Sequence, residues 1–166
     1  MIDALFIAPG NAQEVYQNLS EDYSAIETPT WALLLAESCR SIGYKVGIID
    51  VNAEKLTHQE ALDRVVDLSP RFIVFVVYGQ NVNAGTTGMS GAVALTEFVK
   101  SNGVSIPIIY IGSHVQALPV QTLKKENSID IVCLNEGVYS LHNLLRLSSY
   151  DSDSLRSIKG IGYREN

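Results

Sequence analysis

Five short apolar runs, separated by helix-like segments, constrain the fold of this chain more than any other feature. Each run is rich in Ile, Val or Phe and almost continuously apolar, as expected for strands that are buried on both faces of a parallel sheet. The predicted strands are Ala4–Ala8, Val46–Asp50, Phe72–Val77, Ile106–Ile111 and Ile129–Leu134. Strand–helix alternation of this kind predicts right-handed crossovers and a sheet with helices on both faces.

Helix start and stop signals lie between these strands. Thr28 is a suitable N-cap for a first helix, and Thr57 to Glu60 forms a capping-box pattern for a second. The predicted helices are Pro29–Ile42, a segment from Thr57, Gly88–Ser101, a short helix from Pro119, and Val138–Leu147. The buried face of the first is expected to carry Trp31, Leu34, Leu35, Cys39 and Ile42. The pattern predicts an α/β, flavodoxin-like (Rossmann-like), doubly wound five-stranded parallel sheet of order 2-1-3-4-5.

We expect residues 1–147 to form this domain and residues 148–166 to lead away from it. The stretch 148–154 is polar and is typical of a linker. Beyond it, Ile158–Arg164 is strand-like but has no place among the five predicted strands. We therefore expect this strand to belong to a partner domain that is missing or separate.

Composition excludes several classes of function. The 166 residues have a formal net charge of −6 and no run of Lys or Arg, which argues against nucleic acid or a membrane as partner. The two cysteines, Cys39 and Cys133, are far apart in sequence, so the chain cannot hold an iron–sulfur cluster or a cysteine zinc site. The sequence has no signal peptide, and we expect a cytoplasmic protein.

The loops that follow the strands are expected to form the ligand site. In doubly wound sheets, ligands bind beyond the carboxyl ends of the strands, near the point where the strand order reverses. The loop Pro9–Thr28 has 20 residues, which is long enough to cover a ligand. The other loops there, 78–88, 112–119 and 135–137, are small, polar and glycine-bearing. Such loops would let a large flat ligand approach the backbone closely.

Motifs in these segments resemble the cobalamin-binding domains that precede radical-SAM domains. The resemblance covers nearly the whole chain, up to Leu147. It rests on the order of Pro29, Leu34-Leu35-Ala36, Gly43-Tyr44-Lys45-Val46, Asp50, Gly112-Ser113-His114, Leu118-Pro119, Ile129-Asp130-Ile131-Val132 and Glu136-Gly137. The segment 158–164 also resembles the hairpin that joins such a domain to the radical-SAM barrel. The chain departs from the family pattern at Ser113, Asn135 and Val138, where the family has glycine, glycine and an acid.

The resemblance implies a bound cobalamin, a cobalt corrinoid, whose own base is displaced. None of His58, His114 or His142 lies in the Asp-x-His-x-x-Gly context that supplies a cobalt ligand in the methionine-synthase-like branch, so no protein ligand to the metal is expected. The iron–sulfur cluster and S-adenosylmethionine would lie only on a radical-SAM partner, in cis or in trans. The parent enzyme would be a methyltransferase or a ring-forming enzyme, and this domain alone would have no catalytic residue.

The resemblance places the nucleotide tail near Thr86, Thr87, Gly112 and Ser113, and the corrin against the segments 78–81 and 134–137. The full set of expected cobalamin-binding residues is Tyr78, Gly79, Gln80, Asn81, Thr86, Thr87, Gly112, Ser113, His114, Leu134, Asn135, Glu136 and Gly137.

Simpler roles remain open for several of these residues. Thr86 and Thr87 could cap the third helix, His114 could bond to loop backbone, and Glu136 could be a first-turn acid of the fifth helix. The glycines could serve turns only. The alternative function is a flavodoxin-like binder of FMN or a nucleotide, although residues 11–14 (Asn-Ala-Gln-Glu) make a poor phosphate loop.

Overall fold

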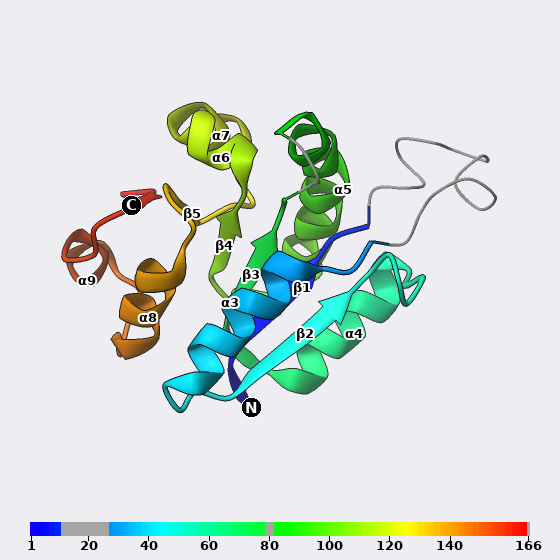
Figure 1. Ribbon diagram of the computed structural model, residues 1–166, viewed down its shortest axis with the longest axis horizontal. Helices are drawn as coiled ribbons and strands as arrows, with labels where there is room; N and C mark the ends of the chain where they lie inside the picture. Colours follow the sequence, from blue (N-terminus) through cyan, green and yellow to red (C-terminus); the bar gives the residue numbers. More distant parts are fainter. Residues whose placement is uncertain (11–26, 79–81, 166) are drawn as a thin grey trace.

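The computed structural model describes residues 1–10, 27–78 and 82–165, and they form one twisted sheet flanked by helices (Figure 1). The sheet has the order β2-β1-β3-β4-β5-β6, and all neighbours are parallel except the last pair. Its strands are β1 (Ile2–Ala8), β2 (Val46–Asp50), β3 (Pro70–Val76), β4 (Ile108–Ile111), β5 (Ile131–Cys133) and β6 (Ile161–Tyr163). The flavodoxin-like prediction, including the order of the first five strands, is confirmed.

Two apolar cores lie on opposite faces of the sheet, because side chains alternate along each strand. In β1, Leu5 and Ile7 face the core under α4 (His58–Leu68) and α5 (Val82–Ser101). Ala4 and Phe6 face the other core, under α3 (Thr30–Ser41), α8 (Val138–Arg146) and α9 (Ser152–Arg156). Among the described residues, no helix is both long and apolar enough to cross a membrane.

The helix boundaries confirm some start signals and correct others. The capping box is present: Glu60 N–H donates to Thr57 Oγ1 (3.3 Å), and Thr57 N–H donates to Glu60 Oε2 (2.8 Å). The predicted N-cap at Thr28 is wrong, since Pro29 occupies the N-cap of α3 and no side chain caps that end. The third helix begins at Val82 rather than Gly88, so Thr86 and Thr87 lie inside α5 and do not cap it.

The predicted loop 112–119 is mostly helical. It contains α6 (Ser113–Ala117), which is followed directly by α7 (Pro119–Lys125). Val115 of α6 is buried in the core under α4 and α5, and Leu123 of α7 packs against it. Packing of these two side chains, one buried and one partly buried, holds the short helices against the sheet.

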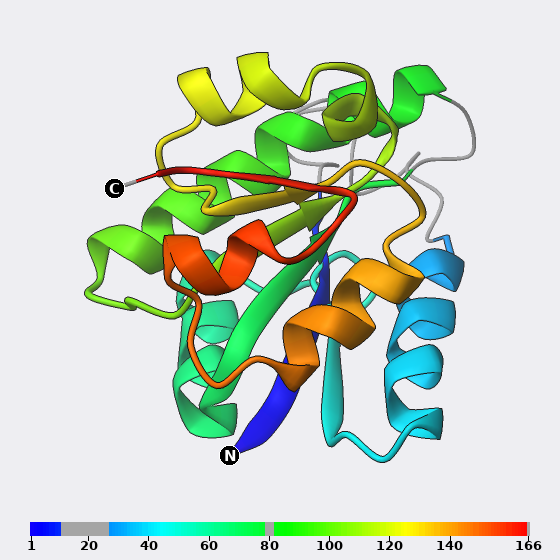
Figure 2. The same ribbon diagram turned by 90° about the vertical axis from the view of Figure 1, so that its left-hand side faces the viewer.

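The C-terminal segment belongs to the sheet, which corrects the expectation that its strand pairs elsewhere. β6 runs antiparallel to β5, with Cys133 opposite Ile161 (Figure 2). Arg164 fixes the strand by donating from Nε to Ile129 O (3.2 Å) and from Nη2 to Glu126 O (2.8 Å). The predicted linker also contains α9, capped by Asp151, which accepts from Ser154 N–H at 2.8 Å. That residues 148–166 lead on to a partner domain stays a prediction.

Candidate functional site at the carboxyl edge of the sheet

The carboxyl ends of β3 and β4 are held together by a close backbone contact. Val77 N–H, one residue beyond β3, donates to Ile111 O at 2.7 Å. A Cβ on Gly112 would lie 2.1 Å from Val77 O, which no side chain could tolerate. Gly112 therefore has a role in the fold itself, and its contact with a nucleotide tail stays a prediction.

A second close contact joins the beginning of α5 to α6. A Cβ on Gly85 would lie 2.4 Å from Ser113 Oγ, so a larger residue there would force the Ser113 hydroxyl to turn away. The approach places His114 Nδ1 3.4 Å from Thr86 Oγ1. The structure thus brings Thr86, Ser113 and His114 together, as predicted, while exposed Thr87 lies in the next position of α5.

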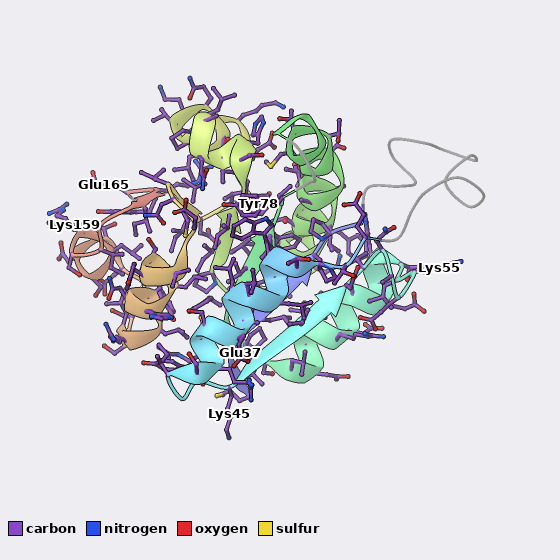
Figure 3. All side chains as sticks on the ribbon, in the orientation of Figure 1. Glu37, Lys45, Lys55, Tyr78, Lys159 and Glu165 are labelled. Carbon is purple, nitrogen blue, oxygen red and sulfur yellow. The ribbon has the colours of Figure 1, made fainter. Side chains whose placement is uncertain are left out.

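An aromatic pair lies beside this cluster, and only one of its members was predicted. Tyr78 follows β3 and is half-buried, and it lies near the centre of the view in Figure 3, whereas Lys55 and Lys159 lie at its two sides. Its ring stacks on Trp31, with centroids 4.8 Å apart and planes 27° from parallel. Its hydroxyl accepts a hydrogen bond from Gln116 Nε2 of α6 at 3.0 Å. Burial, and then the nearby Glu136 carboxylate, raise the pKa of Tyr78.

Trp31 is not on the buried face of α3, which corrects the sequence prediction. The side chains of Trp31, Leu34 and Ile42 are 41%, 57% and 42% exposed, while Leu35 and Cys39 are buried as predicted. Ala32 and Ala36 complete the buried stripe instead. Their small side chains let α3 lie close to the sheet, and the stripe turns Trp31 toward the carboxyl edge. Trp31 and Gln116 are the residues that the sequence prediction of the site missed.

The segment after β5 is shaped by local backbone bonds. Asn135 Oδ1 accepts from Gly137 N–H at 2.8 Å. Gly137 has a left-handed φ of 83° and is the N-cap of α8, and a Cβ there would lie 2.6 Å from Ile111 Cδ1. Glu136 precedes this N-cap and is exposed, so it is not a first-turn acid of α8. Leu134 presents a side chain that is 41% exposed at the same edge.

The described histidines and cysteines are engaged or buried within the fold. The imidazole of His142 lies 2.8 Å from Ser38 Oγ, and that of His58 packs on Phe98. Burial raises the pKa of the Cys39 and Cys133 thiols to about 12, so both are neutral near pH 7. Within the described ranges, no group of three His, Cys, Asp or Glu side chains could hold a metal ion.

Asp130, from the motif that carried the family resemblance, lies at the opposite end of the sheet. Its Oδ2 accepts from Ile108 N–H at 2.7 Å and from Lys100 Nζ at 2.8 Å. These bonds hold the starts of β4 and β5 in register. Asp130 therefore has a structural role away from the candidate site.

Around Tyr78, the described edge offers hydroxyls, amides and an aromatic and aliphatic surface, with the Glu136 carboxylate nearby. Such a surface fits a large, mostly uncharged ligand with a flat apolar body and polar side groups. The predicted residues Gly79, Gln80 and Asn81 lie outside the described residues, as does most of the loop 9–28.

Comparison with known proteins assigns the chain to a family. A B12 binding domain family matches residues 21–145. This match confirms the predicted cofactor and favours it over FMN or a nucleotide. No curated protein matches the chain.

Several solved structures share the fold of this chain, including two radical S-adenosylmethionine enzymes. One is the radical S-adenosylmethionine methyltransferase TsrM from Kitasatospora setae, with a TM-score of 0.70, 13% identity, and 97% of this chain and 28% of that chain covered. The other is the cobalamin-dependent S-adenosylmethionine radical enzyme OxsB, with a TM-score of 0.66, 17% identity, and coverage of 98% and 21%. The present chain thus spans about a quarter of these enzymes.

Proposed function

Because the chain belongs to the B12-binding domain family, we propose that it holds cobalamin with the cofactor's own base displaced and with no protein histidine on the cobalt. The observation that carries this proposal is the placement of the three histidines. His58 and His142 pack against Phe98 and Ser38, and His114 faces Thr86. None of them follows the sequence pattern that supplies a cobalt ligand in the methionine-synthase-like branch.

Residues of the carboxyl edge would hold the cofactor. Thr86, Ser113 and His114 come together from α5 and α6 and offer polar groups for the nucleotide tail, beside Gly112. Tyr78 and Leu134 offer apolar surface for the corrin ring, with backbone groups of residues 135–137 for its amide side chains. Cobalamin supplies the cobalt chemistry when bound, and the protein binds, orients and encloses it.

The domain would serve a radical-SAM partner, in cis or in trans, that carries the iron–sulfur cluster and S-adenosylmethionine. Two features support this proposal. The two cysteines are buried as neutral thiols, so this chain cannot supply the closely spaced thiolates that a four-iron cluster requires. In addition, the fold is shared with TsrM, a methyltransferase, and OxsB, both named as radical enzymes. We propose a methyltransferase as the parent activity.

Visible absorption of the domain reconstituted with hydroxocobalamin tests the lower face of the site. We expect a base-off spectrum that stays nearly unchanged when each of the three histidines is replaced by alanine. A changed spectrum in one folded variant that still binds cobalamin would show that its histidine ligates cobalt.

Product analysis tests whether this domain needs a radical-SAM partner to cleave S-adenosylmethionine. With S-adenosylmethionine and a reductant, the reconstituted domain alone should release no 5′-deoxyadenosine. Formation of this product, free of contaminating iron–sulfur protein, would contradict the proposal.

A further inference from the structure

The Trp31–Tyr78 pair is a flat aromatic surface built from two distant parts of the chain. Trp31 lies in the first turn of α3, and Tyr78 directly follows β3. Their rings stack with centroids 4.8 Å apart. The hydrogen bond from Gln116 Nε2 to Tyr78 Oη, 3.0 Å long, ties the pair to α6. Three elements therefore fix the orientation of one aromatic surface at the carboxyl edge.

Packing against the described residues does not explain why this surface is exposed. Trp31 is 41% exposed, although indole is among the largest apolar groups that a core can bury. Leu134, which directly follows β5 at the same edge of the sheet, is also 41% exposed. A fixed aromatic pair that stays half-exposed, at a sheet edge that carries a further exposed apolar side chain, is typical of a contact surface for a ligand.

We propose that the Trp31–Tyr78 pair supports the corrin ring of cobalamin, so that it contributes affinity for the ring rather than for the nucleotide tail. This inference rests on the proposed function. The corrin is a broad, mostly apolar disc, and aromatic faces pack well on such a surface at low entropic cost. The hydroxyls of Thr86 and Ser113 lie in the α5–α6 cluster instead, where they fit the polar tail.

Two properties of Tyr78 agree with a supporting role. Burial and the Glu136 carboxylate both raise the pKa of its phenol, which therefore stays neutral and presents an uncharged ring. Its hydroxyl is already engaged with Gln116, which prevents the ring from rotating away from Trp31. Gln116 is accordingly a positioning residue that acts through Tyr78.

Binding of two corrinoids separates ring contacts from tail contacts. Cobinamide has the corrin ring but lacks the nucleotide tail, so we would measure dissociation constants of hydroxocobalamin and cobinamide by equilibrium dialysis. Trp31→Ala should raise the dissociation constants of both corrinoids by a similar factor, about tenfold or more, as is common for a central aromatic anchor. Tyr78→Phe keeps the aromatic ring, so it should weaken the binding of both corrinoids less than Trp31→Ala does.

Ile42→Ala is the matched control. Ile42 caps the other end of α3 and is 42% exposed, so its replacement removes a similarly exposed apolar side chain away from the carboxyl edge. It should leave both constants unchanged. Far-ultraviolet circular dichroism of each variant checks that the fold is intact.

Four other binding results would overturn the inference, and each has a different meaning. If Trp31→Ala binds both corrinoids as the wild type does, the pair does not touch the ligand and only this inference fails. If cobalamin binding alone weakens, Trp31 contacts the tail. If binding becomes tighter, the pair obstructs the site. If the wild type binds neither corrinoid, the proposed function fails as well.

Discussion

Replacing Gly112 by alanine should destabilise the fold far more than a glycine replacement usually does. The added Cβ would lie 2.1 Å from Val77 O and 2.7 Å from Val77 C, both backbone atoms that cannot turn away. Overpacking of a well-packed site costs about 1–3 kcal/mol, and a clash with hydrogen-bonded backbone belongs at the upper end, about 3 kcal/mol. Val77 N–H is bonded to Ile111 O, so relief of the clash would also strain the β3–β4 pairing.

Gly103→Ala is the control for backbone conformation. Gly103 has a left-handed φ of 86° with nothing within 4 Å of an added Cβ, so alanine there pays only the conformational cost, about 1 kcal/mol. Urea unfolding followed by circular dichroism measures both variants. Gly112→Ala should also lower the melting temperature by roughly 6–12 °C. Equal losses in the two variants, within about 0.5 kcal/mol, would refute the close contact.

Three further predictions concern stability and reactivity. Ser69→Gly should raise the free energy of unfolding by about 1 kcal/mol, measured in urea, because Ser69 ends α4 with a left-handed φ of 45°; a loss would contradict it. Burial raises the thiol pKa of Cys39 and Cys133 to about 12, so iodoacetamide at neutral pH should label neither in the folded protein and both in urea. Labelling of either thiol in the folded protein would refute this burial. Since the folded pKa of both thiols lies above the ordinary value of 9.0, their contribution to the free energy of unfolding is complete below pH 9 and is lost as the pH rises toward 12. Arg71→Met should cost about 2 kcal/mol, because the half-buried guanidinium of Arg71 donates to carbonyls at the end of α8. The exposed ion pair of Arg64 should contribute less than about 1 kcal/mol, so an equal loss in Arg64→Met would argue against this difference.

The parallel sheet was predictable because its central strands are apolar on both faces. Phe72 to Val77 and Ile106 to Ile111 read as continuous apolar runs, and few other structures can bury such runs. The position of β6 was not predictable in this way. β6 has only three residues, and it reverses onto β5 after Gly160, whose φ is 77°. Pairing of a short strand at the edge of a sheet depends on its contacts with the neighbouring strand, here β5, more than on the pattern of its own residues.

The grouping of some candidate residues at the carboxyl edge was predictable, whereas their contact with a ligand stays a prediction. Loop composition after each strand indicated Thr86, Ser113 and His114, since topology brings those strand ends together. Trp31 was missed because helical periodicity alone placed it on the buried face with Leu35. The buried stripe is instead formed by small residues such as Ala32 and Ala36, which a search for large apolar side chains overlooks. Gln116 was missed because its role depends on the exact end of β4 and the start of α6.

Electron paramagnetic resonance of the bound cofactor, reduced to cob(II)alamin, tests the central claim most directly. A nitrogen ligand on the lower face of cobalt splits each cobalt line, whether the nitrogen comes from the cofactor's own base or from a histidine. Our account predicts that the protein-bound spectrum lacks this splitting, in the wild type and in the alanine variants of His58, His114 and His142 alike. Nitrogen splitting in the wild type that disappears in one of these variants would contradict the account and would identify the ligand.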